Sequence, residues 1–304
     1  AQVDAAEDLP RVFRQTWSAA VCVPPRPVHL DLNGLMGEFV ETGTTEEPPA
    51  ALGAWAAPPH RPGADAAEVA AAARALLSAQ RVAIVAGDAA SLSGCGRELL
   101  APVLTTLGAR GLVSTRHPLH MGVVGNYSAP PANEILCGAE LVLYVGCDTG
   151  DQVTHYWRVP KPGSVRVVQI DADALEFHRS YAAEATVQAD PRAALAALVA
   201  EIGRPDRDGA YITWAQGIME SWRAAIAPRL ASDAVAIDPA RLAAEITRAL
   251  PADGILVADT GYSGIWTGTL VEMEPGQAYR RAAGSLGWAF PASLGAKLAA
   301  PQRK

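Results

Sequence analysis

Short apolar runs alternate with helix-patterned segments through the middle of the chain. Val82–Ala86 and Leu141–Val145 are apolar at every position, and residues 165–170 are apolar at most positions. A parallel strand that packs on both faces has this continuous apolar pattern, and its alternation with helices is typical of a parallel sheet. The pattern therefore predicts an α/β protein with doubly wound parallel sheets.

Capping residues mark two helix starts. Asp190 precedes Pro191, and Asp238 precedes Pro239. A carboxylate that accepts backbone N–H groups, followed by a first-turn proline, is a typical helix start. We therefore expect helices over 191–202 and 239–250. The other expected helices cover residues 9–23, 64–79, 99–107, 133–137 and 291–300 and a segment with Trp214 and Trp222. The other expected strands cover residues 28–32, 112–115 and 255–258 and a short run around Tyr279.

These elements divide the chain into three blocks and a linker. Residues 1–40 hold one helix and one strand, which cannot bury a core alone, so we interpret them as the C-terminal tail of a domain. Residues 41–64 are rich in Pro and Gly without a steady period, as linkers are. Residues 65–202 form a complete middle domain, and residues 203–304 form the first part of another domain. We expect both ends of the chain to lie inside domains.

The charge balance excludes two classes of partner. Lys and Arg number 25 against 32 Asp and Glu, a formal net charge of −7, and no basic cluster is present. Nucleic acids and membrane surfaces both require a concentrated positive field, so neither is an expected partner. No apolar run reaches the roughly 20 residues of a membrane span. The four cysteines show no CxxC spacing, and we expect a reducing, cytoplasmic location.

Two glycine-bracketed turns are the candidate chemistry. One follows the expected strand 255–258, and the other leads into the expected helix 291–300. Loops at the carboxyl ends of strands bind ligands in open α/β sheets, and a helix start offers free N–H groups to an anion. Each turn by itself is equally consistent with a tight connection between packed elements. The candidate binding residues are Gly261, Tyr262, Ser263, Gly284, Ser285 and Leu286.

The order of motifs resembles the thiamine-diphosphate (ThDP) dependent decarboxylases and carboligases of the acetolactate synthase type. The closing strand of that family's pyrimidine-binding domain is similar to PPRPVHLDL, with Arg26 in place of a glycine. The family's middle domain is similar to VAIVAGDAAS, TRHPLHMGVVGNYSAPPANEIL, AELVLYVGCDTGDQVT and VVQIDAD. The opening half of its diphosphate-binding domain is similar to DTGYSGIW and GSLGWAFPASLGAKLA. The resemblance covers nearly the whole chain.

The resemblance implies a role for each turn. Gly261, Tyr262 and Ser263 fall where the family contacts the cofactor diphosphate. Leu286 falls where a bulky apolar side chain bends the cofactor, and the Gly284 carbonyl falls where the family accepts a hydrogen bond from the 4′-amino group. The bend brings the 4′-imino nitrogen near the thiazolium C2–H, which allows the internal proton transfer that makes the nucleophile.

The family's remaining essentials are not found in this sequence. The activating glutamate is expected before residue 1, and no GDG segment, which holds Mg²⁺ in the family, occurs. We therefore assign no catalytic or metal-binding residue and expect the chain to be inactive alone. The resemblance implies an enzyme, a lyase or transferase, that acts on a 2-oxo acid or related small carbonyl substrate. It also implies a homodimer or homotetramer of the full-length enzyme.

The middle domain supports an alternative function, a non-catalytic nucleotide-binding or assembly domain. In relatives this domain holds the ADP part of FAD, a coenzyme A ester, or nothing. Gly87 follows the first expected strand, but Asp88 would face a phosphate with like charge. Asp171 and Asp173 follow a later strand and suit ribose hydroxyls. The other interpretation of these two carboxylates is a helix cap and a solvated turn.

Overall fold

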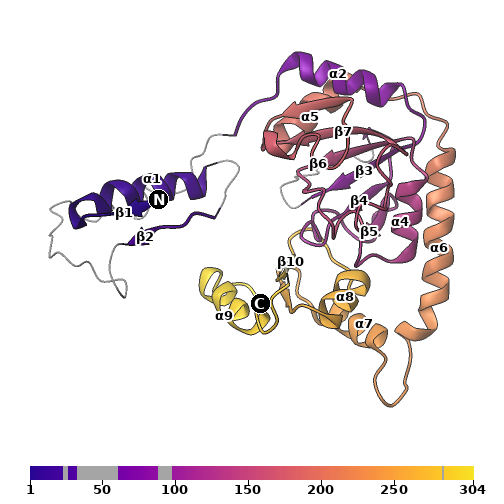
Figure 1. The fold of residues 1–304 in the computed structure, drawn as a ribbon. Helices are drawn as coiled ribbons and strands as arrows, with labels where there is room; N and C mark the ends of the chain where they lie inside the picture. The colour runs from indigo at the N-terminus through magenta and orange to yellow at the C-terminus, as the bar shows by residue number, and fades with distance from the viewer. Residues whose placement is uncertain (23–26, 33–60, 88–97, 283) are drawn as a thin grey trace. The chain divides into compact units, whose positions relative to one another are not determined.

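The computed structural model describes residues 1–22, 27–32, 61–87, 98–282 and 284–304 (Figure 1). Contacts divide the chain into two compact units, Ala1–Pro62 and Gly63–Lys304. In the first unit, β1 (Gln2–Val3) pairs in parallel with β2 (Asp31–Leu32), and η1 (Ala6–Asp8) leads into helix α1 (Leu9–Val21). The expected strand at 28–32 is thus confirmed only in its last two residues.

A six-stranded parallel sheet organises the second unit. The strand order is β5-β4-β3-β6-β7-β8, so the chain starts in the middle of the sheet and winds outward in both directions. The predicted α/β class and the doubly wound sheet are confirmed. The strands are β3 (Val82–Ala86), β4 (Val103–Thr105), β5 (His120–Val123), β6 (Leu141–Val145), β7 (Arg166–Asp171) and β8 (Ala185–Gln188).

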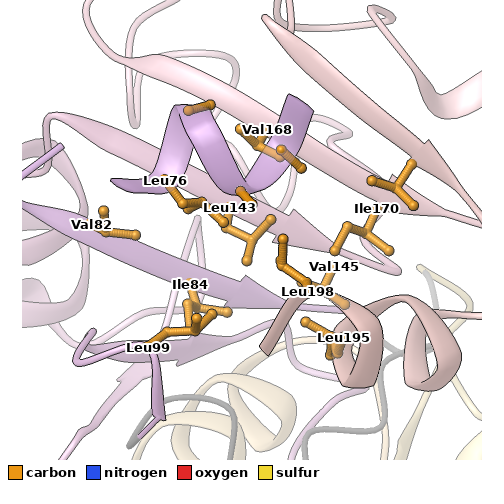
Figure 2. Close-up of a cluster of buried hydrophobic side chains, with 14 of the residues drawn as sticks. Leu76, Val82, Ile84, Leu99, Leu143, Val145, Val168, Ile170, Leu195 and Leu198 are labelled. Carbon is orange, nitrogen blue, oxygen red and sulfur yellow. The ribbon is translucent and has the colours of Figure 1, made fainter. Parts of the chain in front are cut away.

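Helices cover both faces of this sheet (Figure 1). Helices α2 (Ala66–Leu77) and α5 (Pro191–Ile202) pack on one face, and α4 (Pro130–Cys137) and α6 (Ala210–Leu230) pack on the other. Figure 2 shows the first of these layers, in which Ile84, Leu143 and Val168 from three neighbouring strands meet the two helices. Burial on both faces is the reason that these strands read as unbroken apolar runs.

Two expected elements are wrong. The expected helix at 99–107 contains β4, because Pro102 cannot continue a helix and Val103–Thr105 pairs instead with β3. The expected strand at 112–115 is a turn, since Gly111 has a φ of +87° and Thr115 bonds to Met273 outside the sheet. The second neighbour of β4 in the sheet is β5, a strand that was not predicted from the sequence.

The segment between the middle domain and the third block packs tightly. Arg207 donates hydrogen bonds to the carbonyls of Leu76, Ala79 and Leu99. The first half of α6 contributes Tyr211 to the core beneath the sheet. Because residues 63–304 form one compact unit, the predicted boundary between residues 202 and 203 stays a prediction.

A second, two-stranded sheet carries the last part of the chain. Strand β9 (Ile255–Ala258) pairs in parallel with β10 (Ala278–Arg281). Helices α7 (Pro239–Ala249), α8 (Tyr262–Leu270) and α9 (Ala289–Ala299) accompany it. The caps at Asp190 and Asp238 are confirmed, because each side chain accepts N–H groups of the first turn. Within the part of the chain that the structure describes, no helix has the length and apolar character that crossing a membrane requires.

Candidate functional site

The two glycine-bracketed turns meet at one edge of the β9–β10 sheet. Ala258 lies opposite Arg281 at the carboxyl ends of the parallel strands, so both turns start from the same edge. Asp259 links them, because its Oδ2 accepts the backbone N–H of Ala289 at 3.3 Å and its Oδ1 accepts that of Thr260 at 2.7 Å. The structure therefore brings the two predicted turns together.

The first turn is more regular than expected. Gly261 has a φ of +98°, a conformation that glycine adopts readily, and helix α8 starts directly after it. The expectation of a loop at Tyr262 and Ser263 is thus wrong, because both residues belong to the first helical turn. The Ser263 hydroxyl donates to the carbonyl of Asp259 at 3.1 Å. The first N–H groups of a helix have no intrahelical acceptor, so this turn suits an anion.

The second turn depends on two glycines. Gly284 has a φ of +141° and Gly287 a φ of +77°, both in the region that favours glycine. Helix α9 begins at Ala289, two residues earlier than the expected start at Pro291. A Cβ atom added at Gly261, Gly284 or Gly287 would meet no atom within 4 Å. The glycines are therefore required by backbone conformation, and the space beside both turns is open.

Large side chains project from this open edge. Tyr262 and Leu286 each expose 79% of their surface, and Phe290 is also largely exposed. Ser285 is exposed as well. Exposed apolar side chains of this size are available to contact a ligand or another protein segment.

Two polar groups at this edge were not predicted. The Thr260 hydroxyl is buried and has no hydrogen-bond partner among the described residues. The stem of Arg281 lies against Gly264, where an added Cβ atom would be 3.1 Å from its Cδ. Its guanidinium donates to Gln152 Oε1 at 3.0 Å and lies 4.4 Å from the ring centroid of Tyr127. No sequence pattern marks Arg281, because its partners come from the middle domain.

The carboxyl edge of the six-stranded sheet is the second candidate site. Gly87 lies so close to the end of β6 that an added Cβ atom would be 1.9 Å from the Gly146 carbonyl oxygen. Asp88 lies outside the described residues. Asp173 caps η3 (Ala174–Glu176), and Asp171 accepts the N–H of Asp173 at 2.8 Å. Burial raises the pKa of Asp171. The structure thus shows both carboxylates in the local capping and turn roles.

Two hydroxyls at this edge have no partner. Thr105 ends β4, and Thr149 follows β6 by a few residues. Both side chains are buried, and neither hydroxyl has a hydrogen-bond partner in the described part of the chain. Buried hydroxyls of this kind are normally paired, so a ligand or further polar group would satisfy them.

The described residues form no candidate metal centre. Across the residues that the structure describes, no group of three or more His, Cys, Asp or Glu side chains could hold a metal ion. His120 is buried in β5, and burial, with the charges of Arg110, Arg223 and His117, lowers its pKa to about 3. This histidine is therefore neutral at neutral pH. Nothing in the local sequence signals its burial.

Comparison with known families identifies the sheet. Residues 69–198 match the family described as "Thiamine pyrophosphate enzyme, central domain", thiamine pyrophosphate being another name for ThDP. The match begins within α2 and ends within α5, so it encloses the whole six-stranded sheet.

Curated relatives match the chain over nearly its whole length. A probable acetolactate synthase large subunit of Methanocaldococcus jannaschii is 28% identical over 99% of this chain and 53% of the relative. The corresponding protein of Methanococcus aeolicus is 24% identical over 100% and 54%. A probable 2-ketoarginine decarboxylase of Pseudomonas aeruginosa is 30% identical over 98% and 52%. The chain spans about half the length of these relatives. The six-stranded sheet thus matches the central domain of thiamine pyrophosphate enzymes, and the chain is similar along nearly its whole length to members of that family.

Proposed function

We propose that this chain is part of an enzyme that uses ThDP to cleave or form a carbon–carbon bond beside a carbonyl group. The proposed donor is a 2-oxo acid or a related small carbonyl compound. The supporting observation is the meeting of two open glycine turns at one sheet edge, joined through Asp259. This edge has the place and chemistry of a ligand site in an open α/β sheet.

The first turn would hold the diphosphate. Gly261 directly precedes α8 with a positive φ, and Tyr262 and Ser263 are the first residues of that helix, whose first N–H groups have no intrahelical acceptor. These donors stabilise an anion through hydrogen bonds and the helix dipole. The buried Thr260 hydroxyl, which has no partner within the described part of the chain, is one more hydrogen-bonding group at the same turn. The residues present therefore fit a diphosphate.

The second turn would hold the ring portion of the cofactor. The exposed Leu286 side chain would supply apolar contact, and the Gly284 carbonyl would accept a hydrogen bond from the cofactor. Ser285 stands between them and offers a small hydroxyl. When bound, ThDP supplies a nucleophilic thiazolium carbon and an electron sink for the carbanion that cleavage produces. The role of these residues would be to orient the cofactor.

Mg²⁺ is the proposed second component. A diphosphate carries more negative charge than backbone N–H groups and hydroxyls balance, and Mg²⁺ commonly bridges such phosphates. Since the described residues form no metal-binding cluster, we assign no Mg²⁺ ligand among them. We also propose a homodimer or homotetramer, because the exposed Tyr262, Leu286 and Phe290 leave the candidate site open on one side. A cytoplasmic location stays a prediction.

A matched pair of leucine variants tests the proposal. Leu286 and Leu298 are both largely exposed, but Leu298 lies at the far end of α9 from the glycine turn. In the native protein that contains this sequence, we expect Leu286→Ala to weaken ThDP affinity and slow carbon dioxide release from 2-oxo acids. Leu298→Ala should change neither. The proposal fails if the native protein binds no ThDP with Mg²⁺ present, or if both variants behave alike.

Nucleotide binding by the middle sheet is a second candidate function. The observation that favours it is that the buried hydroxyls of Thr105 and Thr149, at the carboxyl edge, have no hydrogen-bond partner among the residues that the structure describes. FAD is one possible nucleotide. Purified protein with flavin absorbance that Thr105→Val reduces would support this function. Colourless protein to which FAD and ADP do not bind in calorimetry would reject it.

A further inference from the structure

The C-terminal end of helix α8 is held by a buried arginine from the middle domain. Arg110 belongs to the loop after β4 and is only 6% exposed. Its guanidinium donates hydrogen bonds to the carbonyls of Gly268 and Val271 at the end of α8. The last carbonyls of a helix have no intrahelical donor, and a cation near them interacts favourably with the helix dipole. Arg110 therefore caps α8 from another part of the fold.

The surroundings of Arg110 give it few other roles. The Tyr279 ring centroid lies 5.8 Å from the guanidinium carbon, and the charge of Arg110 contributes to the lowered pKa of His120. Burial lowers the pKa of Arg110 to about 10, so it remains protonated at neutral pH. A buried charge is costly unless hydrogen bonds satisfy it. The carbonyls of Gly268 and Val271 accept from its two terminal nitrogens, while its buried Nε has no hydrogen-bond partner among the described residues.

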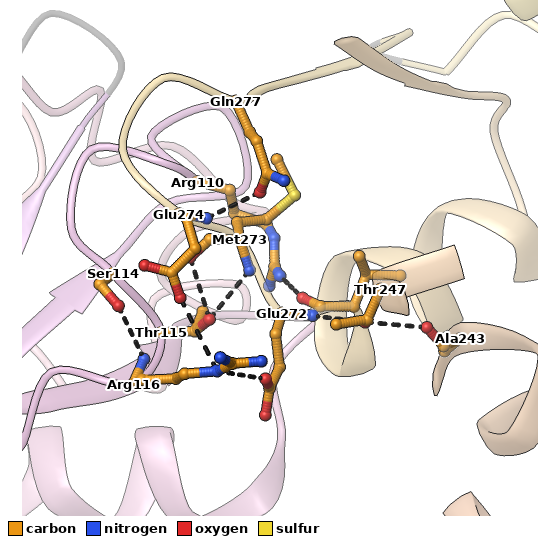
Figure 3. Close-up of polar contacts among 11 residues, drawn as sticks. Arg110, Ser114, Thr115, Arg116, Ala243, Thr247, Glu272, Met273, Glu274 and Gln277 are labelled. Atoms are coloured by element: carbon orange, nitrogen blue, oxygen red, sulfur yellow. Dashed lines mark hydrogen bonds and ion pairs between the residues drawn. The ribbon is translucent and has the colours of Figure 1, made fainter. Parts of the chain in front are cut away.

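The rest of the same loop holds α8 and the segment after it. Leu107 packs closely against Gly268 of α8, because a Cβ atom added at Gly268 would lie only 2.5 Å from Leu107 Cδ2. Thr115 and Met273 form two hydrogen bonds. The Thr115 N–H donates to the Met273 carbonyl at 2.9 Å, and the Met273 N–H donates to the Thr115 hydroxyl at 2.9 Å. Figure 3 shows this contact and, beside it, the ion pair of Arg116 with Glu272. Arg116 Nε lies 2.9 Å from Glu272 Oε2. Residues 106–116 therefore hold α8 and the segment directly after it, Val271–Met273, against the six-stranded sheet domain.

The opposite end of α8 is the candidate diphosphate turn. Tyr262 and Ser263 begin the nine-residue helix whose last turn Arg110 caps. A helix this short moves as a rigid rod, so a change in tilt at one end redirects the N–H groups at the other. We propose that Arg110 is a positioning residue that fixes the direction of α8 and thereby of its first-turn N–H groups. This inference rests on the proposed function for its ligand.

Hydrogen exchange measured by mass spectrometry tests the anchoring step. We expect Arg110→Met to raise exchange in peptides from α8 about tenfold or more, the effect of losing charged hydrogen bonds. Peptides from α5 should stay protected, which shows that the unit remains folded. Arg207→Met is the matched control, because Arg207 likewise donates to backbone carbonyls, but its three acceptors, Leu76, Ala79 and Leu99, lie outside α8. Equal α8 exchange in the two variants would overturn the inference.

A ThDP titration followed by tryptophan fluorescence tests the positioning step. Trp266 lies on α8 and Trp288 beside the second turn, so binding should alter their emission. We expect Arg110→Met to weaken ThDP affinity about tenfold, a drop that Arg207→Met should not show. Unchanged affinity despite faster α8 exchange would refute positioning. If the unaltered native protein binds no ThDP, the proposed function fails, while exchange still decides whether Arg110 anchors α8.

A conservative variant keeps the test valid if Arg110→Met does not fold. Arg110→Lys retains the charge but has a single ammonium group in place of the fork that reaches two carbonyls. We expect it to fold, with α8 exchange and ThDP affinity between those of the native protein and the methionine variant. Native values of both quantities in Arg110→Lys would show that charge alone suffices and would overturn the assigned role of the fork.

Discussion

His120 should make the protein less stable in acid. This side chain is 5% exposed in β5, and its pKa falls from 6.5 to about 3, first through burial and then through Arg110, Arg223 and His117. The unfolded chain therefore takes up a proton near pH 6.5, whereas the folded protein resists protonation until about pH 3. The stabilising effect is complete above the unfolded pKa and is lost as the pH falls towards the folded pKa.

The magnitude follows from this difference. One pKa unit corresponds to about 1.4 kcal/mol, so lowering the pH from 7 to 5 should remove about 2 kcal/mol of the free energy of unfolding through this group alone. His120→Gln removes the titration and should flatten the pH dependence by that amount. Other titrating groups affect both proteins alike, so the comparison isolates His120.

Urea denaturation at pH 7 and pH 5 measures the effect, with the free energy of unfolding obtained by linear extrapolation. His117→Gln is the control, because His117 is nearby but only partly buried, and it should retain most of the native acid dependence. Parallel pH profiles for the native protein and His120→Gln would refute the reasoning. A native protein that is equally stable at both pH values would do the same.

Four further substitutions test the packing and helix stability of the second unit. Arg207→Ala removes hydrogen bonds to three carbonyls and should cost about 2 kcal/mol in urea denaturation. Gly87→Ala places a Cβ atom 1.9 Å from the Gly146 carbonyl oxygen and should cost more than about 3 kcal/mol or prevent folding. Gly217→Ala, at an open position within α6, should instead increase the free energy of unfolding by about 1 kcal/mol through helix propensity. This is measured as a higher melting temperature. Asp190→Ala removes the cap of α5 and should cost about 1 kcal/mol, measured as a lower melting temperature. Unaltered stability in Arg207→Ala or Asp190→Ala, or native stability in Gly87→Ala, would contradict the corresponding contact.

The candidate site was partly predictable from sequence. Gly261 and Gly284 stand out in the sequence because one belongs to a turn after an expected strand and the other to a turn before an expected helix, and both have a positive φ. The contact between the two turns was not predictable, since it depends on Asp259 accepting an N–H from a residue 30 positions away. Cofactor contacts by the predicted residues remain a prediction that the proposed binding tests address.

The sequence by itself determined the elements whose signal is local. Val82–Ala86 and Leu141–Val145 are strands. A short run that is apolar at every position suits a central strand of a parallel sheet, because the side chains on both faces of such a strand are buried. The helix after Asp190 starts where the carboxylate meets the N–H groups of its neighbours. These features need information from only a few adjacent residues.

Tertiary structure decided the features whose partners are distant in the chain. Residues 103–105 form a strand because β3 supplies their hydrogen bonds, although the surrounding pattern predicted a helix. Arg110 is separated by 158 residues from Gly268, the first carbonyl it caps. The local pattern of apolar and polar positions predicts neither feature. The hydrogen bonds and burial that decide them depend on groups that are close in space but distant in the sequence.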